Sequence, residues 1–208
     1  MAETEGVIKY RLEFRQAPAP AAGLIGEING WRDVLHRLGL LGQEPGRYAG
    51  LGFGNVSLRL ADGSGFVISG TQTGHLGRLG AQHYCLVTRC EPEHNRIIAQ
   101  GPVRPSSEAL THGALYAADP QIRCVLHAHS PDIWTLRDRL GLAATGAEVP
   151  YGTPAMAIQV QELLRGPAAR QGIFAMAGHE DGVVAFGPDP EAAGGVLVSY
   201  LARALAGH

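Results

Sequence analysis

Lysine is almost absent from this chain of 208 residues, because Lys9 is the only one. It stands in an N-terminal segment, and we expect it to lie apart from the motifs described below. A lysine Schiff base and a lysine-bearing phosphate loop are therefore excluded as the basis of catalysis or nucleotide binding. Any carbonyl chemistry in this protein must rely on a metal ion or on hydrogen-bond donors.

Cysteine is also scarce, and its number and spacing argue against two common ways of stabilising a fold. Cys85, Cys90 and Cys124 are odd in number and form no Cys-x-x-Cys pair. A structural zinc site and a disulfide framework are both disfavoured, and reduced thiols of an intracellular protein fit better. We expect all three to be small core residues.

Charge and long apolar runs are limited as well. Charged residues make up 17% of the chain and the net charge is −2. The chain therefore lacks the excess of basic residues that is typical of proteins that bind nucleic acids or anionic membranes. No apolar run approaches the ~18 residues that would span a bilayer. The N-terminus lacks the pattern of a signal peptide. We expect a soluble cytoplasmic protein with a small-molecule substrate and a single domain over residues 1–208.

Hydrophobic periodicity predicts an α/β fold with a mixed sheet covered by helices. Within residues 1–22, the alternation over 7–15 predicts a strand, and the proline-rich stretch 16–22 a connector. Helical spacing from Leu24 to Leu38 predicts a helix. A serine-capped helix opens at residues 105–108 and runs to 118. Further strands are expected over 56–60, 66–69, 84–88, 96–100, 122–129, 172–177 and 183–186, and further helices from 130, over 153–164 and over 189–206.

The strongest local signal for chemistry is the pair His127 and His129 at the end of an apolar strand. Residues i and i+2 of a strand point to the same face. Two imidazoles there could meet one metal ion at a Zn–N distance of about 2.0–2.1 Å. The alternative is two ordinary histidines that are satisfied by backbone partners.

His179 is the natural third ligand, because a catalytic zinc has three protein ligands and one open position. It stands in Gly178-His179-Glu180-Asp181-Gly182, between two predicted strands. Glu180 or Asp181 could orient an imidazole, or could supply an oxygen ligand in place of His179. The alternative is an acidic hairpin turn without a metal.

Pro105-Ser106-Ser107-Glu108 and two glycine-rich segments could bind an anion. Ser106, Ser107 and free N–H groups at a helix N-terminus are suited to a phosphate or carboxylate. Glu108 would point into the same site and move a proton. The segments 52–57 and 69–74 could turn N–H groups towards an anion, although ordinary turns between strands also explain them. His112, one helical turn after Glu108, is expected to support the site or to fill the core.

The ordered set of these motifs resembles the class II aldolase/adducin family. It comprises Gly-Asn-Val-Ser (54–57), Ser-Gly-Thr-Gln-Thr-Gly (69–74), Pro-Ser-Ser-Glu (105–108), His-Ala-His (127–129), Pro-Tyr-Gly-Thr (150–153) and His179. The resemblance implies a three-layer α/β/α fold with a central mixed, largely antiparallel sheet. It also implies a homo-oligomer, frequently a homotetramer, with its sites at subunit interfaces. Where the family usually has His-Gly, this chain reads His-Glu-Asp-Gly (179–182).

The resemblance further implies a role for each matching residue. His127, His129 and His179 would bind Zn²⁺, with Mn²⁺ and Fe²⁺ as alternatives. Glu108 would be the catalytic acid/base, and Tyr151 would reach a neighbouring subunit's site as a proton donor. The residues expected to bind substrate or its phosphate are Asn55, Ser57, Thr71, Thr73, Gly74, Ser106 and Ser107.

The predicted function is that of a metal-dependent lyase. It would cleave a C–C bond in a sugar phosphate or a hydroxy-carbonyl compound and leave a metal-stabilised enediolate. Epimerisation, dehydration or decarboxylation at the same site is the first alternative. A non-catalytic adducin-like interaction module is the second, although adducin heads have lost the metal histidines that this chain retains. A hydrolytic zinc enzyme is conceivable but has no supporting nucleophile motif.

Overall fold

The computed structural model describes residues 6–207, which form a large mixed sheet between two layers of helices. The sheet has eight strands in the order β1-β7-β6-β5-β4-β8-β10-β9. Only β1 and β7 run parallel, and every other neighbouring pair is antiparallel. The strands are β1 (Arg11–Gln16), β4 (Asn55–Arg59), β5 (Phe66–Ser69), β6 (Tyr84–Glu91), β7 (Arg96–Gly101), β8 (Cys124–His129), β9 (Ile173–Ala175) and β10 (Gly182–Gly187). A separate short pair consists of β2 (Gly42–Gln43) and β3 (Gly52–Phe53).

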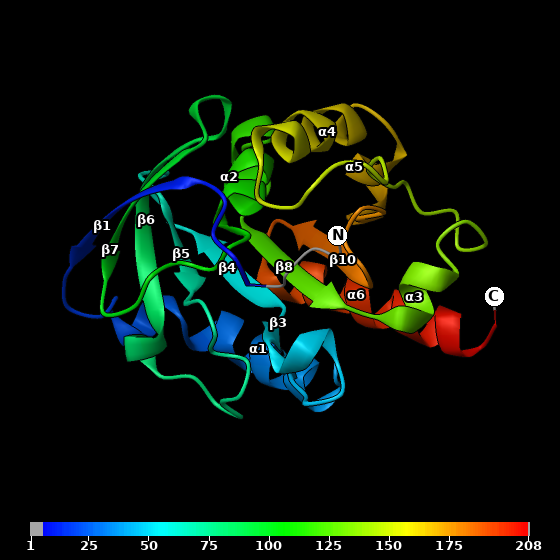
Figure 1. Cartoon of the computed structure of the whole chain (residues 1–208), viewed down its shortest axis with the longest axis horizontal. Coiled ribbons are helices and arrows are strands. Elements are labelled where there is room, and N and C mark those ends of the chain that lie inside the picture. The colour runs from blue at the N-terminus through cyan, green and yellow to red at the C-terminus, as the bar shows by residue number, and fades with distance from the viewer. Residues whose placement is uncertain (1–5, 208) are drawn as a thin grey trace.

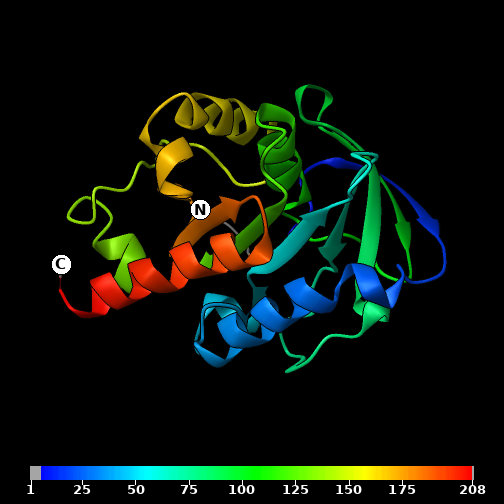
Figure 2. The ribbon, with the colours of Figure 1, turned by 180° about the vertical axis from the view of Figure 1, so that it is seen from behind.

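Helices cover both faces of the sheet, so the predicted three-layer α/β/α fold is confirmed (Figures 1 and 2). The α-helices are α1 (Gly26–Arg37), α2 (Ala109–Ala118), α3 (Pro131–Thr135), α4 (Pro154–Leu164), α5 (Pro167–Gln171) and α6 (Pro190–Leu205). Helices α2, α4 and α5 contribute to one buried apolar cluster, and α1, α3 and α6 to a second. Short 3₁₀ turns occur at η1 (Ala22–Leu24), η2 (Tyr48–Gly50), η3 (Ala81–His83) and η4 (Pro92–His94).

Three helices begin where local capping chemistry predicts. The side chains of Ser130, Thr153 and Asp189 each accept a hydrogen bond from a backbone N–H of the first turn, and a proline follows each of them. Such caps satisfy N–H groups that have no partner within the helix. The starts of α3, α4 and α6 are therefore properties of the local sequence.

The start of α2 differs from the prediction. The helix begins at Ala109 rather than within residues 105–108, and Glu108 itself occupies the position before the helix. Ser106 still accepts a hydrogen bond from the Glu108 N–H at 3.3 Å. The preceding residue, Pro105, forms an isolated bridge with Gly70. This contact holds Pro105 in an extended form against the end of β5, so the helix begins later in the sequence than predicted.

The cysteines lie where the sequence predicts. Cys85 and Cys124 are fully buried and Cys90 is half-buried, and all three are free thiols. Burial raises the pKa of the Cys85 and Cys90 thiols to about 12. They are therefore inert core residues at neutral pH. No helix among residues 6–207 combines the length and the apolar character that a bilayer crossing needs.

Helices α1 and α6 approach each other closely at Gly194. A Cβ at this position would lie 2.1 Å from the Trp31 ring, whereas a Cβ at Gly195 would have nothing within 4 Å. We expect Gly194→Ala to lower the free energy of unfolding by about 1–3 kcal/mol through overpacking. Gly195→Ala should raise it by about 0.5–1 kcal/mol, because alanine loses less conformational entropy in a helix. Urea unfolding of both variants tests this, and equal effects would contradict the close contact.

Candidate metal centre

The register of three neighbouring strands positions the first two histidines. His127 and His129 share one face of β8, as their spacing predicts. Strand β4 places Asn55 opposite His127, and β10 places Gly182 opposite His129. The turn between β9 and β10, which carries His179, therefore lies beside the end of β8.

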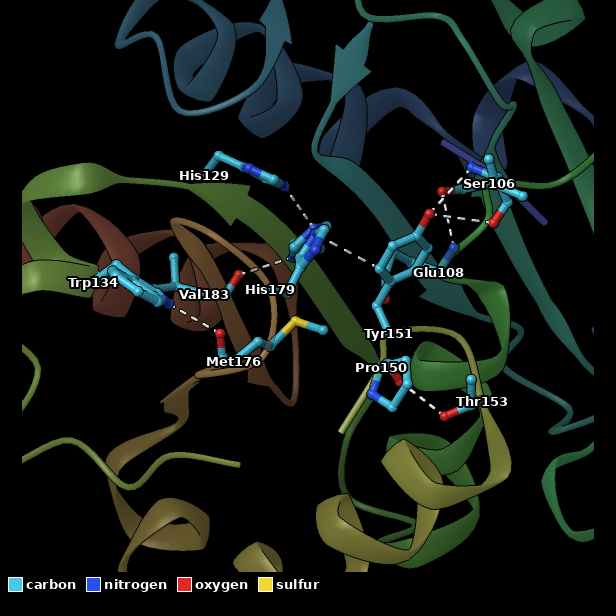
Figure 3. Close-up of polar contacts among 12 residues, drawn as sticks. Ser106, Glu108, His129, Trp134, Pro150, Tyr151, Thr153, Met176, His179 and Val183 are labelled. Carbon is cyan, nitrogen blue, oxygen red and sulfur yellow. Dashed lines mark hydrogen bonds and ion pairs between the residues drawn. The ribbon is translucent and has the colours of Figure 1, made fainter. Parts of the chain in front are cut away.

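Short hydrogen bonds fix this turn. The Met176 N–H donates to the Gly182 carbonyl at 2.8 Å, and the Gly182 N–H donates to the His179 carbonyl at 2.9 Å. The Trp134 indole N–H donates to the Met176 carbonyl at 2.9 Å and ties the turn to α3 (Figure 3). These bonds restrain the turn and so help to position His179.

The three histidines converge on one point. One ring nitrogen from each of His127, His129 and His179 lies within 4.8 Å of the others, and the Nε2 atoms of His127 and His129 are 3.2 Å apart. At most 3% of each residue is exposed. The Nδ1 of His127 lies 3.2 Å from the Val183 carbonyl, which orients its Nε2 towards the other rings. Three buried imidazoles fit the donor set of a catalytic zinc site with one open position.

Burial keeps these imidazoles neutral. It lowers the pKa of His127 to about 4 and lowers the pKa values of His129 and His179 well below the usual range. The neighbouring histidines add to the effect, followed by the positive charge of Arg47 at His129 and of Lys9 at His179. Neutral imidazole is the form that binds a metal ion. The three side chains are therefore ready to act as ligands at neutral pH.

Glu108 lies next to the histidines, as predicted. Only 1% of the residue is exposed, and its Oε1 is 3.9 Å from the His179 Nε2 (Figure 3). The N–H of Ser106 donates to the Ser69 carbonyl at 3.3 Å, which anchors the segment before α2 to the end of β5. Glu108 and the three histidines thus share one buried cluster.

Most of the predicted anion-binding residues line one pocket. Among the described residues that line it, none has a charged side chain. At Gly74 a Cβ would lie 2.1 Å from the Gly42 carbonyl oxygen, so this loop needs glycine to approach β2. The buried Arg32 guanidinium donates to the Thr73 carbonyl at 3.4 Å and the Gly77 carbonyl at 3.0 Å, which braces the loop. The predicted residues in the pocket are Asn55, Thr71, Thr73, Gly74, Ser106 and Ser107.

Ser57 does not share this pocket, and the structure does not support its predicted contact with substrate. The residue is fully buried, two positions farther into β4 than Asn55 and beneath α2. Its Oγ lies 2.7 Å from the His112 Nδ1 and 2.6 Å from the Tyr116 hydroxyl. Ser57 and His112 therefore belong to a buried polar network that joins β4 to α2.

Tyr151 lies in the site of its own chain. Its ring centroid is 4.7 Å from that of His179, and the residue is fully buried. Its hydroxyl accepts a hydrogen bond from the Val7 N–H at 3.2 Å and donates to the Val7 carbonyl at 3.4 Å. This placement differs from the expectation that Tyr151 would reach a neighbouring subunit's site.

Lys9 also reaches the site, and the expectation that it lies apart from the motifs is wrong. Its Nζ is 3.5 Å from the centroid of the Tyr151 ring. The next residue, Tyr10, donates a hydrogen bond from its hydroxyl to the Ser106 carbonyl at 2.7 Å. The segment before β1 therefore crosses the site, a contact between residues that are about a hundred or more positions apart in sequence.

A second group beside the histidines includes Tyr48, which has no counterpart in the sequence predictions. The Tyr48 ring lies 4.5 Å from that of His129, and the Phe53 ring lies 5.5 Å from it. The Tyr48 hydroxyl donates to the Asp181 Oδ2 at 2.7 Å, and burial together with this bond raises the pKa of Tyr48. Asp181 is thus engaged by Tyr48, and Glu180 is exposed. No motif marks residues 47–48, so only the tertiary structure reveals them.

Two curated proteins are similar in sequence to parts of this chain. A 3-oxo-tetronate 4-phosphate decarboxylase from Haemophilus influenzae is 31% identical over 142 residues, which cover 68% of this chain and 62% of that protein. A methylthioribulose-1-phosphate dehydratase from Stenotrophomonas maltophilia is 54% identical over 39 residues, which cover 19% of this chain and 18% of that protein. The matched segments span less than two thirds of either relative.

Solved structures and a family model agree on the fold. An L-fuculose-1-phosphate aldolase from Thermus thermophilus has a TM-score of 0.64 and 21% identity, covering 89% of this chain and 93% of that one. A sugar-phosphate aldolase from Thermotoga maritima has a TM-score of 0.64 and 20% identity, covering 88% and 94%. Residues 46–204 match the model of the class II aldolase and adducin N-terminal domain. The chain therefore belongs to the class II aldolase and adducin family, which includes aldolases, dehydratases and decarboxylases.

Proposed function

We propose that this protein is a metal-dependent lyase of the class II aldolase type. Its substrate would be a small sugar phosphate or hydroxy-carbonyl compound in which a C–C bond is cleaved. One observation carries the proposal: three buried histidines, the buried Glu108 side chain and a polar pocket lie side by side. Asn55 links them, because it lines the pocket and pairs with His127 across the sheet.

The histidines His127, His129 and His179 would hold the ion. When bound, a divalent metal supplies a Lewis acid that polarises an oxygen of the substrate. Zinc suits three imidazoles, and manganese and iron are alternatives because imidazole serves several metals. Class II aldolases typically depend on such an ion, which agrees with this donor set.

Glu108 would move the proton in the reaction. Its carboxylate is buried and lies 3.9 Å from His179, so it faces the space where a substrate on the metal side would sit. Burial excludes water that would compete for the proton. This position supports a role for Glu108 as a general acid or base.

The pocket would hold the phosphate or carboxylate of the substrate. Ser106 and Ser107 offer hydroxyl groups before α2, and residues 72–74 would offer backbone N–H groups, since those of Gly70 and Thr71 already donate to the His83 and Arg104 carbonyls. Backbone N–H groups in glycine-rich turns and before helices bind anions without a cationic side chain. Tyr151 is proposed as a proton donor. For this role its hydroxyl has to give up its hydrogen bonds to the Val7 main chain and donate to the substrate instead.

Decarboxylation and dehydration form the second candidate, with the same residues in the same roles. The names of the two curated relatives, a decarboxylase and a dehydratase, favour this alternative. Both act on phosphorylated compounds by name, which agrees with an anion pocket beside the histidines. The reaction class therefore has to be decided by product analysis.

A substrate panel tests the proposal. The purified protein is loaded in turn with zinc, manganese and iron and incubated with phosphorylated and unphosphorylated ketoses and hydroxy-keto acids. Metal-dependent release of an aldehyde or of pyruvate is the expected result. Carbon dioxide without an aldehyde would support decarboxylation. Failure to take up any metal, together with no turnover, would favour the adducin-like interaction module.

A further inference from the structure

A hydrogen bond joins the η2 turn, where Tyr48 packs on His129, to the turn between β9 and β10 that carries His179. The Tyr48 hydroxyl donates to the Asp181 Oδ2 at 2.7 Å, across 133 positions of sequence. Asp181 is two residues after His179, and the Tyr48 ring packs against the His129 ring at 4.5 Å. The Ser130 N–H, next to His129, donates to the Asp181 carbonyl at 2.8 Å. The bond therefore joins a residue that contacts His129 to a residue in the turn that carries His179.

The backbone at both ends of the bond is strained. Tyr48, Ala49 and Asp181 have φ values of 47°, 56° and 61°. For residues other than glycine this left-handed conformation costs about 1–2 kcal/mol. Such strain persists only where surrounding contacts impose it, and it gathers at functional sites. Here it turns the two side chains towards each other.

Arg47 completes the arrangement from the other side of the phenol. Its Nη2 donates to the Tyr48 hydroxyl at 2.9 Å, and its guanidinium lies 4.4 Å from the centroid of the Phe53 ring. Its Nη1 donates to the Gly39 carbonyl at 3.2 Å. The hydroxyl thus accepts from Arg47 and donates to Asp181. This orientation makes Tyr48 a rigid link and not an adaptable surface side chain.

We propose that Tyr48 and Asp181 are positioning residues that hold His129 and His179 at the spacing a metal ion requires. Asp181 would act through Tyr48 and through the main chain of the turn, without binding the metal. The inference rests on the proposed metal site. It adds Tyr48, which no sequence motif marks, and it gives Asp181 a defined partner in orienting the imidazoles.

Cobalt(II) binding to the full chain tests the inference. The variants are Tyr48→Phe, Asp181→Asn and the double variant, and all three keep the size of the side chains. Asparagine also tolerates the left-handed backbone at position 181. Competition with a chelator gives the cobalt affinity, and the visible spectrum of bound cobalt reports the arrangement of its ligands. Tyr200→Phe on α6 and Asp138→Asn at a position away from the trio are matched controls.

We expect each single variant to weaken cobalt affinity about 10- to 100-fold, as loss of a residue that orients ligands does. The double variant should lose no more than Tyr48→Phe, because that variant already removes the bond that Asp181→Asn weakens by taking the charge from the acceptor. The cobalt spectrum should change in all three variants, and both controls should behave as wild type.

Three results would overturn the inference in distinguishable ways. Wild-type protein that binds no cobalt would remove the metal site itself, and the inference with it. Wild-type binding with unchanged affinity and spectrum in the variants would overturn the inference alone. A lower melting temperature of the metal-free variants with an unchanged spectrum would assign Tyr48 and Asp181 a purely structural role.

Discussion

Glu108→Gln is expected to lower turnover at least about 100-fold while the protein still binds its metal, because general acid–base catalysis contributes about 10²–10⁴-fold. Glutamine has the size of glutamate but cannot take up a proton. The three histidines stay in place, since the side chain of Glu108 is not part of the trio. Turnover is measured with the substrate found by the panel, and metal content by elemental analysis of the same sample.

A matched control and the metal content of the variant distinguish an acid/base role of Glu108 from a role in holding the ion. Glu162→Gln replaces a glutamate on α4, away from the histidines, and should leave turnover and metal content unchanged. Retained turnover in Glu108→Gln would remove the acid/base role from this residue. Loss of metal along with activity would show instead that Glu108 helps to hold the ion.

His179→Ala is expected to weaken metal affinity by more than the about 10- to 100-fold that loss of a supporting residue causes. Only two imidazoles of the trio would remain, and two ligands do not make a stable zinc site in a protein. Chelator competition measures the affinity of the full chain, and circular dichroism confirms that the variant is folded.

The comparison with Asp181→Asn decides which residue is the third ligand. We expect His179→Ala to have the larger effect, because the Asp181 carboxylate is engaged by the Tyr48 hydroxyl. His94→Ala removes an exposed histidine and should leave the affinity unchanged. A larger loss in Asp181→Asn than in His179→Ala would make the aspartate the ligand.

Much of the fold follows from local sequence. Alternating apolar residues predict the strands, and the caps Ser130, Thr153 and Asp189 predict where three helices begin. These signals act within a few residues, so neighbouring sequence is sufficient. The start of α2 is the exception, because the bridge between Gly70 and Pro105 outweighs the local capping signal.

The candidate site is only partly predictable in this way. His127 and His129 share a face because a strand repeats every two residues, and this requires no knowledge of the rest of the chain. The order of motifs that the family shares predicts that His179 and Glu108 lie beside them. The assignment of Ser57 to the substrate was not supported, since strand periodicity does not show that α2 covers it.

The sequence by itself determined the α/β class, the pair of histidines on one strand face and the inert cysteines, because each depends on short-range periodicity or composition. The tertiary structure alone decided that Lys9 lies on Tyr151, that Tyr151 belongs to the site of its own chain and that Tyr48 reaches Asp181. These contacts join residues that are about 130 or more positions apart, or depend on how distant strands align. Their geometry is set by packing of the whole domain, which no local pattern encodes.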